Sequence, residues 1–328
     1  MHAMKSPRVW TRRSVTWALG GVLLALAGIT AWLLLPGAGL GGVPGAVLGL
    51  TLLGYGVALR PYASDRQVLS AAAGHLADAV ARREAAVLRR LLADRVGTGR
   101  PQAAQVRWRV EGGTDTGSLN TIADFYQRLP GGRLVVLGPA GAGKTVLALR
   151  GLLDLIAALP EEPGVRLRVP VRLDRPDLDR LDAALAEHLV SAYRVGPAIA
   201  RALVDDGWIL PVLDGLDGVD PSLLVRALAP PRPVILTGRD GLPPVPDTTV
   251  VRLQPLTIEQ VAAWLTYQFP DPTKPPGVEH RWLRVLTHLG ADGTGPLATR
   301  LRSPLELART VRAYRDPATD PDDLLRRD

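Results

Sequence analysis

The sequence predicts an α/β fold in which a parallel β-sheet is covered by helices on both faces. Short apolar runs that suit buried strands alternate with segments of helical periodicity between residues 118 and 253. A glycine-rich segment joins one of these strands directly to a helix. Two long uncharged runs precede this region, and residues 254–328 show helical periodicity alone. The chain therefore divides into an N-terminal hairpin, a stalk, an α/β core and a small helical lid.

Composition allows a large core and excludes several kinds of site. The chain has 328 residues, of which 47% are hydrophobic. It has no cysteine, which excludes disulfides, thiolate chemistry and cysteine-ligated zinc. The net charge is +7, but the arginines are interleaved with acids and form no basic stripe with aromatic spacing. We therefore expect a solvated surface and no nucleic-acid partner.

Residues 1–62 are predicted to form a two-helix transmembrane hairpin. The run from Ser14 to Leu35 is uncharged, and at about 1.5 Å per residue it spans roughly 33 Å, enough for a bilayer core. A second uncharged run extends from Val43 to Leu59. Basic residues flank both outer ends, so both termini are expected in the cytoplasm. The sequence thus predicts a multi-pass protein of the cell membrane, with the lipid bilayer as a partner and the following domain cytoplasmic.

Two other interpretations of residues 14–59 are weaker. A cleaved signal peptide would explain the basic start and the first apolar run, but it leaves the second run unexplained. A buried helix pair in a soluble domain would need a polar face, and neither run has one.

Residues 63–117 are predicted to form an amphipathic stalk helix followed by a linker. Apolar residues recur at helical spacing from Val68 to Leu92, and the charged side chains, Glu84 among them, fall largely off that face. From Gly97 to Gly117 the chain is rich in Gly, Thr and Arg, which is typical of a linker. One short strand is a candidate within it, at residues 106–110.

The segment from Gly138 to Thr145 fits the phosphate-binding loop pattern G-x-x-x-x-G-K-[ST] without a mismatch. An apolar run before it predicts a buried strand, and the residues after it predict a helix, which is the context that this motif requires. Glycines let backbone N–H groups turn toward a phosphate, and the helix N-terminus adds partial positive charge. We expect Lys144 to reach the β- and γ-phosphates and the Thr145 hydroxyl to hold Mg²⁺. The predicted nucleotide-binding residues of this loop are Gly138, Pro139, Ala140, Gly141, Ala142, Gly143, Lys144 and Thr145.

Residues 118–253 are accordingly predicted to be a P-loop NTPase core, and residues 254–328 a helical lid. The strand before the glycine loop is expected at 134–137, and further strands at 165–169, 208–213, 233–236 and 250–253. Core helices are expected at 122–129, 178–193 and 198–204, besides the one after the loop. Lid helices are expected at 257–268, 279–289 and 303–314.

Two strand ends supply polar side chains for the same site. Asp214 ends an apolar strand, where a carboxylate can hold the Mg²⁺ already bound by Thr145; the alternative is a turn residue. Asp217 is a candidate to orient the attacking water, the alternative being an ordinary loop residue. Arg239 ends the next strand, where a guanidinium would lie beside the γ-phosphate; the alternative is a surface arginine paired with Asp240. The predicted catalytic residues are thus Lys144, Asp217 and Arg239, and the predicted metal ligands are Thr145 and Asp214.

These motifs resemble a NACHT domain, within the STAND class of signalling ATPases. The glycine loop resembles the Walker A motif, residues 213–217 the Walker B motif, and residues 236–239 the sensor-1 strand. Residues 252–260 resemble the start of the helical lid, and Ser303-Pro304-Leu305 resembles its proline motif. The resemblance covers residues 119–315 and implies ATP as ligand, Mg²⁺ as cofactor and Pro304 near the base. It also implies a switch in which the nucleotide state sets lid position and self-association into a homo-oligomer.

Two departures from that pattern leave two functions open. NACHT domains usually carry Asp-Glu where this chain has Asp217-Gly218, so the acid thought to support hydrolysis is missing. No winged-helix region or repeat array follows the lid, so we expect the hairpin or an unknown protein partner to supply input or output. The first function is a membrane-anchored, ATP-binding signalling switch with slow ATPase turnover. The second is a hydrolysis-deficient nucleotide-binding scaffold that uses ATP as a structural ligand, and whether the protein is an enzyme stays open.

Overall fold

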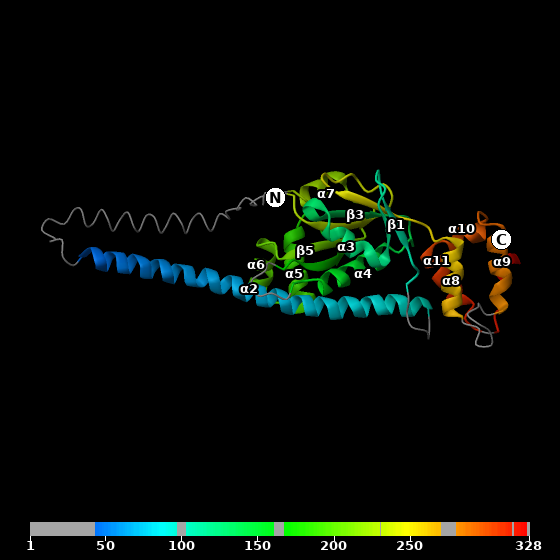
Figure 1. Ribbon diagram of the computed structural model, residues 1–328, viewed down its shortest axis with the longest axis horizontal. Coiled ribbons are helices and arrows are strands. Elements are labelled where there is room, and N and C mark those ends of the chain that lie inside the picture. The colour runs from blue at the N-terminus through cyan, green and yellow to red at the C-terminus, as the bar shows by residue number, and fades with distance from the viewer. Residues whose placement is uncertain are drawn as a thin grey trace. The chain divides into compact units, whose positions relative to one another are not determined.

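The computed structural model describes residues 43–96, 103–160, 167–229, 231–269, 280–316 and 318–326, with side chains for all of these but 43–65, 93–96 and 280. The chain divides into two compact units, Met1–Val68 and Leu69–Asp328, and the second holds the sheet (Figure 1). The first predicted membrane run, 14–35, lies outside the described residues. The second begins helix α2 (Val43–Val96), where its side chains are not described. None of the helices in the described part combines the length and the apolar character that a bilayer crossing needs.

Helix α2 continues without a break past residue 62, so the second predicted membrane segment and the stalk are one helix. Its buried side chains recur three or four residues apart and pack into the core of the second unit. The stripe consists of Leu69, Ala73, Leu76, Ala77, Val80 and Glu84. The predicted apolar face is therefore confirmed at several positions, but Val68 is 51% exposed and Glu84 lies on the buried stripe instead of off it.

The core contains a seven-stranded sheet in the described part of the chain, in the order β2-β1-β7-β3-β6-β5-β4. Its strands are β1 (Arg107–Val110), β2 (Thr116–Ser118), β3 (Arg133–Leu137), β4 (Val169–Asp174), β5 (Ile209–Asp214), β6 (Val234–Gly238) and β7 (Thr249–Leu253). From β7 to β4 the pairing is parallel, and helices cover both faces (Figure 1). The predicted α/β fold is confirmed.

One edge of the sheet differs from the prediction. Strand β1 pairs antiparallel with β7 and with β2, so the sheet is mixed and not wholly parallel. The candidate strand at 106–110 is confirmed as β1, and together with β2 it forms the second half of the predicted linker. Trp108 anchors it, because its indole is 2% exposed and its Nε1–H donates to the carbonyl oxygen of Ser118 over 2.8 Å. Burial of an aromatic side chain thus overrides the turn-rich composition of the segment.

The central strands β3, β5 and β6 are buried along their whole length, as expected for parallel strands covered on both faces. Strand β4 lies four residues later than its predicted position, because it begins where Val169 pairs with Ile209 of β5. Apolar and other residues alternate through both the predicted and the observed range, so the sequence pattern does not show where the strand begins or ends. Its bounds are set by pairing with β5. Pro170 is tolerated because β4 is the edge strand.

The predicted core helices are confirmed as α3 (Ile122–Gln127), α4 (Lys144–Ala157), α5 (Leu181–Tyr193) and α6 (Pro197–Asp205). A further helix, α7 (Pro221–Ala227), was not predicted from periodicity. Its start is fixed locally, since the Asp220 carboxylate accepts a hydrogen bond from the backbone N–H of Ser222 and Pro221 occupies the first helical position.

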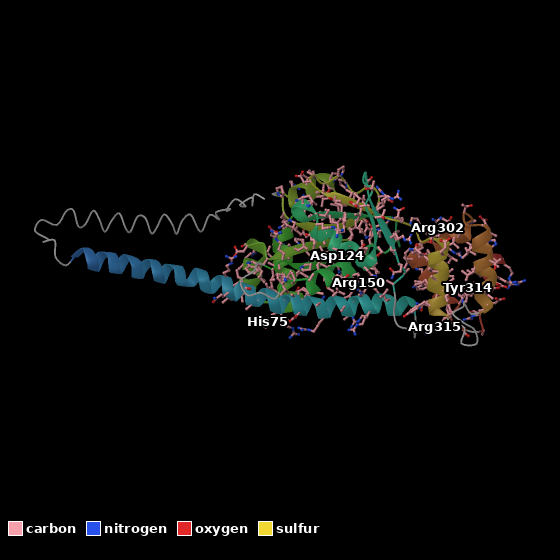
Figure 2. The ribbon with its side chains drawn as sticks, viewed as in Figure 1. His75, Asp124, Arg150, Arg302, Tyr314 and Arg315 are labelled. Carbon is pink, nitrogen blue, oxygen red and sulfur yellow. The ribbon has the colours of Figure 1, made fainter. Side chains whose placement is uncertain are left out.

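The predicted lid segment, residues 254–328, holds in its described part α8 (Ile258–Gln268), α9 (Leu283–Ala291), α10 (Pro296–Leu301), α11 (Pro304–Ala313) and α12 (Asp323–Arg326). Its core is aromatic: Trp282 is fully buried, stacked on Phe269 and met edge-on by Tyr314. Arg302 ties the lid to the chain leaving β7, because its backbone carbonyl and its Nε both hydrogen-bond to the backbone of Leu256 (Figure 2). The three predicted lid helices are confirmed, and α10 lies between the last two.

Candidate functional site

The glycine loop joins β3 to α4 and has the backbone shape that the motif predicts. Gly141 and Gly143 have φ values of 78° and 97°, a left-handed conformation that residues with side chains rarely adopt. Gly143 also precedes the first turn of α4, a 14-residue helix. The N-terminal N–H groups of such a helix lack intrahelical partners and carry partial positive charge, which favours an anion at this end.

The Lys144 ammonium lies against the glycine loop and is partly buried. Its Nζ donates hydrogen bonds to the backbone carbonyl oxygens of Gly138 over 2.8 Å and Pro139 over 3.0 Å. Burial lowers the pKa of Lys144, and the carboxylate of Asp217 partly opposes that shift. The charges of Arg239 and Asp214 act on the same ammonium, so the predicted site residues lie within one electrostatic neighbourhood.

Asp214 at the end of β5 is placed next to Thr145 of α4, although β5 does not pair with β3, the strand before the glycine loop. The Thr145 hydroxyl donates to Oδ1 of Asp214 over 3.3 Å. Strand β6 lies between the glycine-loop strand and β5, which the sequence did not indicate. Thr237 of β6 fills the interval: its hydroxyl donates to the same oxygen of Asp214 and accepts from the backbone N–H of Gly215. Asp214 is 3% exposed and Thr237 is fully buried, so this arrangement is shielded from water.

Asp217 and Arg239 form an ion pair with each other. Nε of Arg239 lies 2.8 Å from Oδ2 of Asp217, and the backbone N–H of Arg239 donates to Oδ1 over 2.9 Å. The alternative pairing of Arg239 with Asp240 is not seen, since Asp240 pairs with Arg252. Both partners remain solvent-accessible, with Arg239 60% and Asp217 37% exposed. They are therefore free to separate at low energetic cost.

The lid proline motif lies on the glycine loop. The backbone N–H of Leu305 donates to the carbonyl oxygen of Gly141 over 3.2 Å. A β-carbon at Gly141 would come within 2.9 Å of the Leu305 side chain and 3.0 Å of the Ser303 hydroxyl. Pro304, at the first position of α11, is thus held between two residues that touch the loop. That Pro304 lies near the base of a nucleotide stays a prediction.

The donor set at this edge fits magnesium better than a softer metal. Thr145 and Asp214 offer a hydroxyl and a carboxylate oxygen, which are hard ligands of the kind that Mg²⁺ prefers. In the described part of the chain, no three residues of the types His, Cys, Asp or Glu are grouped so as to hold a metal. A site with so few protein ligands suits an ion whose remaining ligands come from phosphates and water.

Sequence reasoning missed one residue that touches this arrangement. Nη1 of Arg172, on β4, lies 3.3 Å from Oδ2 of Asp214. Its Nε contacts Glu84 of α2 over 3.1 Å. Arg172 was missed because β4 was predicted to end at residue 169. Glu84 was missed because the amphipathic pattern of α2 places charged side chains off the buried face. Arg172 continues the alternation of Arg166 and Arg168, so no signal in the sequence singled it out.

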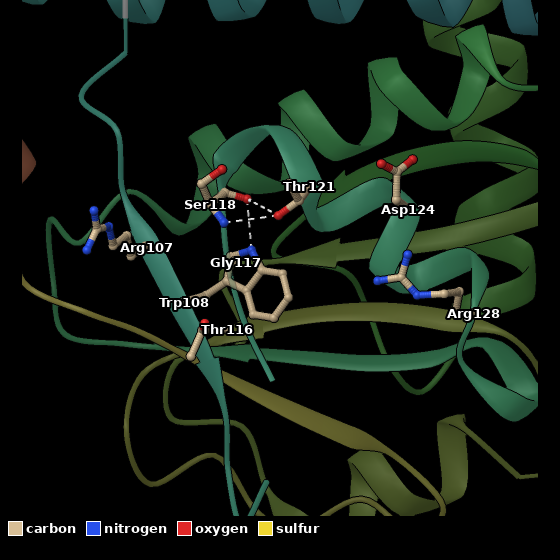
Figure 3. A pocket seen from close by; sticks show the side chains of 8 residues that line it. All are labelled: Arg107, Trp108, Thr116, Gly117, Ser118, Thr121, Asp124 and Arg128. Carbon is tan, nitrogen blue, oxygen red and sulfur yellow. Dashed lines mark hydrogen bonds between the residues drawn. The ribbon is translucent and has the colours of Figure 1, made fainter. Parts of the chain in front are cut away.

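A separate pocket of about 470 Å³ lies against β1, β2 and the segment that leads into α3 (Figure 3). Its lining is Arg107, Trp108, Thr116, Gly117, Ser118, Thr121, Asp124 and Arg128. None of the predicted site residues contributes to it. The hydrogen bonds between Ser118 and Thr121 that Figure 3 marks fix the turn into α3, so these polar groups have a structural use.

Comparison with known proteins adds little. No protein-family model and no curated protein matches the sequence. Among solved structures, that of C. elegans PCH-2 is similar at a TM-score of 0.35 and 13% sequence identity. The match covers 63% of this chain and 64% of that chain, which is less than two-thirds of its length. A likeness this low says nothing of ligand or activity.

Thr237→Val should destabilise the protein by about 1–3 kcal/mol, because valine leaves the Gly215 N–H and one bond to the buried Asp214 unsatisfied. Thr237→Ser keeps the hydroxyl and should lose less. Thermal denaturation of the three proteins measures this. A valine variant as stable as the wild type would show that Asp214 does not depend on the Thr237 hydroxyl.

Proposed function

We propose that the chain is a membrane-anchored, NACHT-like switch that binds Mg·ATP at the glycine loop. The observation that carries this proposal is the 3.3 Å contact between the Thr145 hydroxyl and the Asp214 carboxylate, which come from α4 and β5. The two oxygens would hold Mg²⁺, while Lys144 and the loop N–H groups would hold the phosphates. Bound there, Mg²⁺ would neutralise charge on the phosphates.

The switch part of the proposal is supported by the lid. The backbone N–H of Leu305, on α11, donates a hydrogen bond to Gly141 of the glycine loop. A change in the nucleotide bound by the loop would therefore act directly on α11. We propose that the nucleotide state sets lid position, that the lid controls self-association, and that a protein partner detects the result. ATP as the nucleotide, Pro304 beside its base, and self-association come from the resemblance to NACHT domains.

Membrane attachment is proposed from the uncharged runs at 14–35 and 43–59. Full-length protein should stay with the membrane pellet after alkaline carbonate washing, as an integral protein does, with the termini accessible from the cytoplasmic side. Release of the protein into the supernatant would contradict the hairpin.

The second candidate, a scaffold that binds ATP without hydrolysing it, is favoured by the state of Asp217. Its two carboxylate oxygens are both engaged by Arg239, and residue 218 is a glycine that supplies no second acid. Gly218 has a φ of 72°, so placing glutamate there would combine a strained backbone with the new carboxylate. The role of Asp217 is therefore tested at residue 217 itself.

Lys144→Ala should weaken nucleotide binding by roughly 10- to 150-fold, since a hydrogen bond to a charged group contributes about 1.5–3 kcal/mol. Arg150→Ala is the matched control, because it removes a positive charge from the same helix where Arg150 pairs only with Asp154 at the surface. Titration of both variants and the wild type with a fluorescent ATP analogue and Mg²⁺ gives the affinities. Equal affinity in all three proteins would contradict the assignment of the site.

Asp217→Asn separates the two functions, because asparagine keeps a hydrogen-bond acceptor for Arg239 but cannot act as a base. For the switch with ATPase activity, single-turnover hydrolysis should be slow in the wild type and fall roughly 100-fold or more in the variant. For the scaffold, both proteins should bind ATP and neither should hydrolyse it above background. Measurable hydrolysis that the substitution leaves unchanged would assign the water-orienting role to another residue.

A further inference from the structure

Helix α2 carries a buried carboxylate in a stripe that is otherwise apolar. Glu84 is 2% exposed, one turn beyond the fully buried Val80. Burying a carboxylate is costly unless it is paired and hydrogen-bonded. Glu84 meets both conditions: Oε2 accepts from Nε of Arg172 over 3.1 Å, and Oε1 accepts from the Tyr193 hydroxyl over 3.2 Å. Packing alone would be served by an apolar side chain at this position, so the carboxylate calls for another explanation.

Arg172 is bonded to two carboxylates that belong to different parts of the second unit. Its Nε binds Glu84, and its Nη1 lies 3.3 Å from Oδ2 of Asp214. The side chain is 15% exposed. Burial lowers the pKa of Arg172, but Glu84 and Asp214 raise it by more, so the guanidinium stays charged. A planar guanidinium can hold two such partners in fixed directions, which a lysine ammonium cannot.

We infer that Arg172 is a positioning residue that couples helix α2 to the metal carboxylate Asp214, with Glu84 holding the guanidinium in place. The inference rests on the proposed function, because it takes Asp214 as a ligand of Mg²⁺. It goes beyond that function by naming α2 as the element whose docking regulates the site.

The direction of the coupling follows from the charges. Glu84, Arg172 and Asp214 together carry a net charge of −1, and a divalent cation at Asp214 is opposed by the guanidinium beside it. Glu84 weakens that repulsion, because its carboxylate pairs with Arg172 and holds the guanidinium toward α2. Without the Glu84 charge, Arg172 is left to pair with Asp214 alone and to repel the cation. Docked α2 therefore favours Mg²⁺ binding, and by reciprocity Mg²⁺ with nucleotide favours docked α2.

Other charges near Glu84 do not replace Arg172. Nε of Arg83 lies 3.9 Å from Oε1 of Glu84, but that side chain is half exposed and also stacks over the Tyr193 ring. His188 packs edge-on against the same ring, and burial lowers its pKa, so it adds little positive charge near neutrality. Among the described residues, the side chain that joins Glu84 to Asp214 is that of Arg172. Arg172 is thus the link between α2 and the site.

The test uses the full chain and two variants. Glu84→Gln removes the charge but keeps the shape of the side chain, since its amide oxygen can accept from Arg172 and its amide N–H can donate to the Tyr193 hydroxyl oxygen. Tyr193→Phe is the matched control, since it removes one hydrogen bond to Glu84 and leaves the ion pair. Mg²⁺ is titrated at a fixed concentration of a non-hydrolysable ATP analogue. Glu84→Gln should raise the half-saturating Mg²⁺ concentration at least about fivefold. Tyr193→Phe should leave it unchanged, and nucleotide binding in EDTA should be the same in all three proteins.

A second measurement needs no variant, so it decides the matter even if Glu84→Gln does not fold. Amide hydrogen exchange of residues 69–92 in the wild type should slow when Mg²⁺ is added to protein saturated with the analogue in EDTA. Unchanged exchange, or an unchanged Mg²⁺ requirement in a folded Glu84→Gln variant, would overturn the coupling while the proposed function stands. Failure of the wild type to bind the analogue at all would overturn both.

Discussion

The site depends on a single buried carboxylate that three elements share. Asp214 is 3% exposed and receives the hydroxyls of Thr145 from α4 and Thr237 from β6, and the guanidinium of Arg172 from β4. A carboxylate so buried must be satisfied by fixed donors, and each donor fixes one element against β5. The need of the Asp214 carboxylate for hydrogen-bond donors therefore helps to hold α4, β6 and β4 in place around the end of β5.

The sequence was most informative where local chemistry dictates structure. A glycine loop between a strand and a helix can be predicted because left-handed backbone at Gly141 and Gly143 needs glycine, and Asp214 because it ends a wholly apolar strand. It was least informative where the decision is made by partners distant in sequence. The order of β3, β6 and β5, the start of β4, and the burial of Glu84 depend on contacts between residues 23 to 101 apart in the sequence, which periodicity along the chain does not contain. The pairing of Asp217 with Arg239 belongs to the same class.

Two elements outside the sheet contact different parts of the site. The lid reaches it through Leu305 on Gly141, beside the phosphate loop, whereas α2 reaches it through Glu84 and Arg172, beside the metal carboxylate. A nucleotide with its metal would act on both contacts, while a nucleotide without metal would act on the lid alone. On the proposed function, the lid and α2 would therefore respond to different parts of the ligand. Because α2 is one helix from Val43 onward, its docking is covalently linked to the N-terminal apolar segment.

The central claim is that Asp214 holds the metal of a bound nucleotide. Mn²⁺ replaces Mg²⁺ at oxygen sites and can be followed by electron paramagnetic resonance, with a non-hydrolysable ATP analogue present. Asp214→Asn is the informative variant, because asparagine still accepts hydrogen bonds from Thr145 and Thr237 but carries no charge. The account predicts that wild-type protein binds Mn²⁺ together with the analogue and that the variant binds it at least tenfold more weakly, in line with the loss of a charged ligand. Equal Mn²⁺ binding by a folded Asp214→Asn variant would contradict it.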